Sequence, residues 1–163
     1  MSRLIGTFFG VGYLPWAPGT WGTAAALPVA YVLFLVGGFP ALAIATVGAT
    51  LLGWWATAEM TRGRDNHDPS EVVIDEVVGM WITLWPVFIG ASHAGVDALQ
   101  LWPGWLAGFV LFRIFDINKF GPIGWADRLD TPLGVMLDDV FAGIAAAICV
   151  GVLAWISHGM LGL

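Results

Sequence analysis

The chain has 163 residues, of which 58% are hydrophobic and 11% are charged, whereas soluble domains carry about 25% charged residues. A net charge of −6 with only six Lys and Arg residues excludes nucleic-acid binding by phosphate neutralisation, and a single cysteine excludes a disulfide framework. The composition therefore predicts an integral membrane protein, surrounded by membrane lipid, with a single domain over residues 1–163.

The N-terminal run is apolar, but it is a poor candidate for a spanning helix. Glycine or proline interrupts it at Gly6, Gly10, Gly12 and Pro15, and no small-residue cleavage site typical of a signal peptide follows. We expect Leu4–Trp21 to form an interfacial or re-entrant segment.

Long stretches without Asp, Glu, Lys or Arg then predict about five spanning helices, since one span needs about 20 apolar residues. Residues 4–58 carry no such charge, and Gly37-Gly38-Phe39-Pro40 is a turn signal that divides this stretch. The expected architecture is an all-α, polytopic helical bundle. Its spans are expected at about Thr23–Val36, Phe39–Ala58, Val77–Val96, Ala98–Phe112 and Val140–Leu163.

The basic residues indicate the orientation of these spans. All six fall in loops or helix ends on one side of the membrane, and the loops on the other side have none. Because basic loops stay in the cytoplasm, we expect the N-terminus inside and the C-terminus outside. The six residues are Arg3, Arg62, Arg64, Arg113, Lys119 and Arg128.

Eleven of the twelve carboxylates lie on this same side, and Asp97 is the exception. Solvation of polar loops is a sufficient explanation for Asp65, Glu71 and Asp130. The remaining acidic residues are therefore the better candidates for a functional site.

Two acidic pairs, Asp75-Glu76 and Asp138-Asp139, are expected at the starts of the third and fifth spans. The helix dipole favours carboxylates there, so capping is one interpretation. A second interpretation follows from Gly79 and Gly143, each four residues after an acid, because glycine lets helices approach closely. Clustered carboxylates repel one another unless they are protonated or bridged by a cation, and oxygen ligands suit Mg²⁺. We therefore expect both pairs to be Mg²⁺ ligands.

Arg113, Asp116 and Lys119 recur at i, i+3 and i+6 near the end of the fourth span, so they share a broad helix face. A local ion pair near a helix C-terminus is the simpler interpretation. Ionisable groups within a span are nevertheless functional candidates, and two cations beside a metal site suit a phosphate ester. We expect Arg113 and Lys119 to bind phosphate and Asp116 to take part in catalysis.

Two shorter motifs add candidates to this site. Free N–H groups at a helix N-terminus bind anions, so Gly19 and Thr20 at the start of the first span are candidate phosphate-binding residues, although such a turn is more often only a loop. His67 lies in the acidic loop before Asp75. It is a candidate general acid, and the alternative is a solvated loop histidine.

These motifs together resemble the signature of the phosphatidylglycerophosphatase A family. They run in family order from about residue 10 to 145 and cover most of the chain. In one departure, Phe120-Gly121 separates Lys119 from Pro122, where the family usually has proline directly after the lysine, so the resemblance does not fix the local geometry of Lys119. The matching segments are Pro18-Gly19-Thr20-Trp21-Gly22, His67-Asp68-Pro69, Val73–Leu84, Phe112–Asp116, Pro122-Ile123 with Trp125, Asp127-Arg128, and Asp138-Asp139 with Gly143.

The resemblance implies a Mg²⁺-dependent lipid phosphatase at the cytoplasmic face of the bacterial inner membrane. Such an enzyme converts phosphatidylglycerophosphate to phosphatidylglycerol and phosphate. Under this hypothesis the acidic pairs hold one or two Mg²⁺ ions with Asp116 beside them, and Arg113 and Lys119 neutralise the phosphoryl oxygens.

Two other classes of protein stay open at this point. A phosphotransferase of the CDP-alcohol type would also cluster aspartates, but its Asp-Gly-x-x-Ala-Arg signature is absent. A cation transporter needs ionisable groups near the bilayer midplane, whereas these stop at one membrane edge. A homo-oligomer is also possible, because the small-residue faces Ala24–Ala26 and Ala145–Ala147 could pack helices within or between chains.

Overall fold

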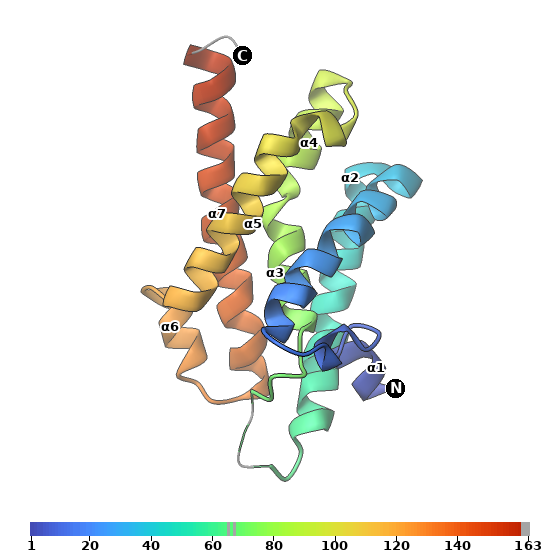
Figure 1. The fold of residues 1–163 in the computed structure, drawn as a ribbon, viewed down its shortest axis with the longest axis vertical. Helices are drawn as coiled ribbons and strands as arrows, with labels where there is room; N and C mark the ends of the chain where they lie inside the picture. The colour runs from blue at the N-terminus through green and yellow to red at the C-terminus, as the bar shows by residue number, and fades with distance from the viewer. Residues whose placement is uncertain (65, 67, 161–163) are drawn as a thin grey trace.

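The computed structural model describes residues 1–64, 66 and 68–160, and these residues form helices and turns but no β-strand. The all-α class expected from the sequence is thereby confirmed. Figure 1 shows an elongated bundle with both the N-terminal segment and the long loops at its lower end. The elements are α1 (Ser2–Gly6), η1 (Val11–Tyr13), α2 (Pro18–Thr61), α3 (Ile74–Thr83), α4 (Trp85–Ala94), η2 (Ala98–Leu101), α5 (Trp102–Asn118), α6 (Pro122–Asp127) and α7 (Pro132–Met160).

Four stretches of the described chain are long and apolar enough to cross a membrane. The longest, α2, consists of two helices joined at Gly37 and Gly38, where the backbone is not helical. Figure 1 shows its two limbs folded back as a hairpin, so the predicted turn is confirmed. Counted as two limbs, α2 brings the apolar segments to the five that the charge spacing predicts. The four stretches are Pro18–Thr61, Ile74–Ala94, Ala98–Asn118 and Pro132–Ser157.

The predicted start of the last span is wrong. Helix α7 begins at Pro132, and the backbone N–H of Gly134 donates to the Thr131 hydroxyl (3.1 Å). A capping threonine followed by proline is a helix-start signal. Asp138-Asp139 therefore lies in the second turn of α7 and not at its positive end, which removes the capping interpretation for this pair.

The third span agrees with prediction at its start and differs in its interior. Asp75-Glu76 occupies the first turn of α3, as expected. Helix α3 ends at Thr83 and α4 begins at Trp85, because Pro86 has no N–H to continue the hydrogen-bond ladder. The span is thus two helices in succession, and nearly all of α3 is buried.

Helix α3 lies at the centre of the bundle, against α2 and α7. A Cβ on Gly79 would lie 2.6 Å from the Asp139 carbonyl oxygen, and one on Gly143 would overlap the Gly79 carbonyl. The Thr83 hydroxyl donates to the carbonyls of both Gly79 (2.9 Å) and Gly143 (3.3 Å). The predicted close approach at these two glycines is therefore confirmed, and it brings the two acidic pairs together.

The small-residue faces contribute to packing within the chain. One alanine of each face, Ala26 and Ala146, is fully buried. The indole N–H of Trp81 in α3 donates to the Ala26 carbonyl (3.0 Å). These contacts fix the first limb of α2 against α3.

The N-terminal segment does not form a spanning helix. Helix α1 and the η1 turn pack beside the lower end of α2. The Gly6 carbonyl accepts the Val73 N–H (2.9 Å), and Gly12 lies so close to the Glu71 carbonyl that a Cβ would overlap it. The segment thus supports the residues that lead into the first turn of α3.

Candidate active site

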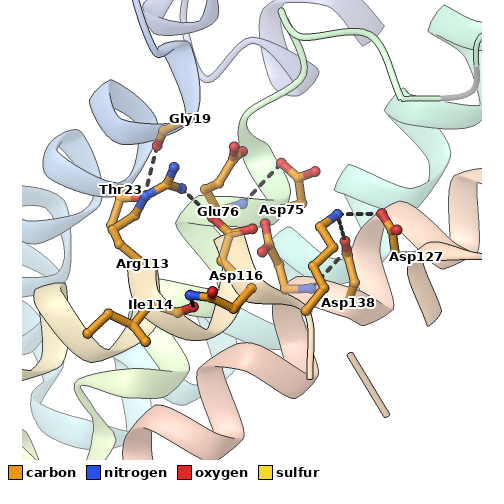
Figure 2. A network of polar contacts seen from close by, with 12 residues as sticks. Gly19, Thr23, Asp75, Glu76, Arg113, Ile114, Asp116, Asp127 and Asp138 are labelled. Carbon is orange, nitrogen blue, oxygen red and sulfur yellow. Dashed lines mark hydrogen bonds and ion pairs between the residues drawn. The ribbon is translucent and has the colours of Figure 1, made fainter. Parts of the chain in front are cut away.

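Three carboxylates from two helices meet at the lower end of the bundle. Asp75 and Glu76 come from α3 and Asp139 from α7, and one oxygen from each lies within 4.8 Å of the other two. Asp75 and Asp139 are buried, with 5% and 3% exposure. Figure 2 shows Asp75 and Glu76 grouped with the side chains of α5. We call Asp75, Glu76 and Asp139 the carboxylate triad.

The triad is chemically suited to a cation. Glu76 Oε2 and Asp139 Oδ1 are buried and have no hydrogen-bond partner among the described residues. Uncompensated buried carboxylate oxygens are costly, and oxygen ligands are those that a hard divalent cation prefers. The donor set therefore fits the Mg²⁺ that the sequence predicts, and three of the four residues expected as ligands belong to it.

Asp138 is not part of the triad and pairs instead with Lys119, which follows the end of α5. Its carboxylate accepts a hydrogen bond from the Lys119 ammonium (2.8 Å), and Lys119 also pairs with Asp127 of α6. Burial lowers the pKa of Lys119, but these two carboxylates outweigh that effect and raise the pKa above its ordinary value. Lys119 is consequently a fixed positive charge beside the triad.

The Phe120-Gly121 departure leaves Lys119 in reach of the site. Helix α5 ends at Asn118, Lys119 adopts a left-handed backbone conformation (φ 49°), and α6 begins after Gly121 (φ 53°). Asp127 was not predicted as a site residue. Asp127 belongs to a segment that matches the family, and this match was the signal available in the sequence. The sequence did not show that α6 brings Asp127 next to Lys119.

Arg113 and Asp116 form an ion pair on α5, and both are half-buried. Asp116 also interacts electrostatically with Glu76 and Asp139. Figure 2 shows the Arg113 guanidinium beside Asp116 and Gly19. The predicted helix face at the end of the fourth span therefore does turn toward the triad.

Gly19 lies directly on the triad. A Cβ built on it would be 2.1 Å from Glu76 Oε1 and 3.4 Å from Arg113 Nη1. The Thr23 hydroxyl donates to the Gly19 carbonyl (2.8 Å), and the Thr20 N–H donates to the Ala17 carbonyl (2.9 Å). The start of α2 is thus part of the site, although the Thr20 N–H already has a partner.

The acidic loop before α3 is only partly described. His67 lies outside the described residues, so its predicted role stays a prediction. Asp68 is exposed, yet desolvation by the neighbouring protein raises its pKa; Lys119 lowers that pKa, and Asp127 and Asp116 raise it. The loop therefore approaches the Lys119 side of the site, which the sequence did not indicate.

Apolar spanning segments, a buried carboxylate triad and two adjacent cations define a polytopic membrane protein equipped to handle phosphate esters. The chain belongs to the phosphatidylglycerophosphatase A family, whose sequence model matches residues 4–154. The chain is therefore a phosphatase. Its membership of this family favours the phosphatase class over the phosphotransferase and the cation transporter. The expected family resemblance is confirmed.

Relatives from three bacteria match nearly the whole chain. A phosphatidylglycerophosphatase A of Haemophilus influenzae is 37% identical, covering 91% of this chain and 85% of the relative. One of Escherichia coli is 33% identical, covering 96% and 83%. A Bacteroides thetaiotaomicron protein named "Putative phosphatidylinositol-3-phosphatase" is 37% identical, covering 94% and 93%. No solved structure gives a significant match.

Proposed function

We propose that this phosphatase hydrolyses phosphatidylglycerophosphate to phosphatidylglycerol and phosphate, with Mg²⁺, at the cytoplasmic face of the bacterial inner membrane. The observation that carries the proposal is the contact of the carboxylate triad with Gly19 and Arg113 at one end of the bundle. Two relatives bear the name of this activity. The cytoplasmic orientation is inferred from the six basic residues, because basic loops stay in the cytoplasm. All six belong to segments of the chain that lie at or next to this end of the bundle.

The triad would hold the metal ion. Asp75, Glu76 and Asp139 supply the oxygen ligands, and the unpartnered oxygens of Glu76 and Asp139 are available for this role. When bound, Mg²⁺ supplies Lewis acidity, which polarises a phosphoryl group and lowers the pKa of a water molecule. Asp138 would act next to the ligands, by holding Lys119.

The chain's own cations would bind and orient the phosphate. The Arg113 guanidinium can donate two parallel hydrogen bonds to phosphoryl oxygens, and Asp116 fixes its position. Lys119 would add a point charge, held in place by Asp127 and Asp138. Neutralising and positioning the phosphoryl oxygens is most of what phosphoryl-transfer catalysis requires.

The position of the site suits a lipid substrate. The acyl chains of a phospholipid stay in the bilayer, while its headgroup lies at the interface where the polar residues of α3, α5 and α7 gather. His67 remains our candidate for the proton that the leaving alcohol needs. A homo-oligomer remains a prediction.

Phosphate release by the purified protein tests this function. Phosphatidylglycerophosphate should release phosphate in Mg²⁺ and not in EDTA, while phosphatidic acid should release little. Phosphatidylinositol 3-phosphate belongs in the same assay, because the Bacteroides relative bears that activity in its name. Preferential release from the inositol lipid would replace the proposed substrate, and no release from any of the three lipids would refute the proposal.

A further inference from the structure

A groove of about 260 Å³ lies between α6, the end of α5 and the lower half of α7. Every side chain that lines it is apolar. Figure 1 shows these three elements side by side at one flank of the bundle, away from α2. We call this cavity the flank groove; the residues that line it include Phe115, Phe120, Ile123, Phe141, Ile144, Ala145 and Ile148.

The flank groove continues directly from the Lys119–Asp138 ion pair. On α7, Asp138 is followed at i+3, i+7 and i+10 by Phe141, Ala145 and Ile148, which share its helix face. On α5, Phe115 lies one turn before Lys119, whose N–H donates to the Phe115 carbonyl (2.9 Å). A polar end with a fixed positive charge and a long apolar wall therefore belong to one continuous surface.

The length of this surface matches one leaflet of a bilayer. The ten residues from Asp138 to Ile148 rise about 15 Å along α7, and the hydrocarbon core is about 30 Å thick. Ile148 is 63% exposed and Ile144 is 43% exposed. The groove is thus open to the membrane from the level of the headgroups toward the midplane.

We propose that the flank groove binds one acyl chain of the phospholipid whose phosphate is held at Arg113 and Lys119. This inference rests on the proposed function. An amphipath with a phosphate and an aliphatic chain complements both the cations Arg113 and Lys119 at the polar end and the apolar wall beneath them. A groove of this volume accommodates a single chain and leaves the second chain in the bilayer.

The groove would act by orientation and not by hydrophobic affinity. Lipid tails are as apolar as the groove wall, so transfer of a chain from bilayer to groove gains only van der Waals packing. Its effect is to hold the headgroup in register with the carboxylate triad. Filling the groove should accordingly lower kcat/KM several-fold, because the headgroup is less often in register with the triad.

Chain-length dependence tests the proposal. Ala145→Trp enlarges a small lining residue and fills the groove, and Ile148→Trp blocks the midplane end. As a control, Ile44→Trp places the same residue on an exposed α2 position (73%) outside the groove. We expect both groove variants to lower kcat/KM for dioleoyl phosphatidylglycerophosphate about 5-fold. For the dihexanoyl lipid, Ile148→Trp and Ile44→Trp should match the wild type, because a six-carbon chain does not reach Ile148.

The proposal would be overturned if Ile148→Trp changed kcat/KM equally for both lipids. It would also be overturned if neither groove variant, although folded, changed kcat/KM for either lipid. A second readout does not depend on catalysis: a phospholipid with a photoreactive diazirine in one acyl chain should label residues 141–148. Unlabelled phosphatidylglycerophosphate should compete for this labelling. Labelling that is spread evenly over lipid-facing positions and that the competitor does not reduce would show contact with bulk lipid only. This result would also overturn the proposal. Absence of phosphate release by the wild type at every chain length would instead refute the proposed function.

Discussion

Replacement of Gly19 by alanine is expected to lower kcat/KM about 100-fold while changing stability little. The added Cβ would lie 2.1 Å from Glu76 Oε1, and real Cβ atoms essentially never come within 3.0 Å of a heavy atom outside their own residue and its chain neighbours. The Glu76 carboxylate must therefore retreat by about 1 Å, and a misplacement of that size costs on the order of 100-fold in rate. Because the displaced atom ends a flexible side chain, the cost in folding free energy is only about 1 kcal/mol.

The assay compares initial rates of phosphate release in mixed micelles with thermal unfolding followed by tryptophan fluorescence. Gly48→Ala is the matched control, since it also adds a methyl group within α2 and its Cβ meets no heavy atom within 4 Å. The control should keep wild-type rates. Near-wild-type activity of Gly19→Ala would show that Glu76 is not needed at this position. A large fall in the unfolding temperature would mean that the glycine serves folding and would refute the reasoning as well.

Three further predictions follow from the same site. Mg²⁺ at 100 times its Kd should raise the wild-type Tm by about 5–10 °C, and Asp139→Asn should lose this rise. In EDTA the variant should be more stable than the wild type, because one repulsive charge is gone. Lys119→Met should lower kcat/KM about 10–100-fold, the factor expected for loss of a hydrogen bond from a charged group, whereas Lys119→Arg should retain part of the wild-type kcat/KM. Equal kcat/KM values in the wild type and both variants would exclude a role for the charge. Gly143→Ala should lower the free energy of unfolding by about 1–3 kcal/mol, because the added Cβ overlaps the Gly79 carbonyl. Denaturant titration measures this effect against the control Gly151→Ala, whose Cβ meets no atom within 4 Å. Equal stabilities of the two variants would contradict the close crossing of α3 and α7.

Sequence reasoning was most successful where a feature depends on local composition. Runs without charge predict the apolar segments because the cost of burying charge in lipid is independent of the fold. Gly37-Gly38 breaks α2 because glycine tolerates non-helical backbone angles. The pairing of Gly79 with Gly143 was also predictable, since only glycine permits so close a crossing.

The sequence treated Asp138 and Asp139 as equivalent, and only the tertiary structure separates them. Neighbouring residues on a helix point about 100° apart, so the rotation of α7 about its own axis decides which of the two carboxylates faces α3. Asp139 shares the face of Gly143 and joins the triad, while Asp138 turns to Lys119. The start of α7 at Pro132 fixes how far into the helix both lie.

By itself the sequence therefore predicted which residues are candidates for the chemistry and that they gather at one end of the apolar segments, because charge and hydropathy are properties of residues. The tertiary structure alone decided which of them touch. It placed Gly19 on Glu76 and carried Asp127 to Lys119, contacts that span 57 and 8 positions of the chain. Such contacts follow from the crossing and rotation of packed helices, which no local pattern encodes.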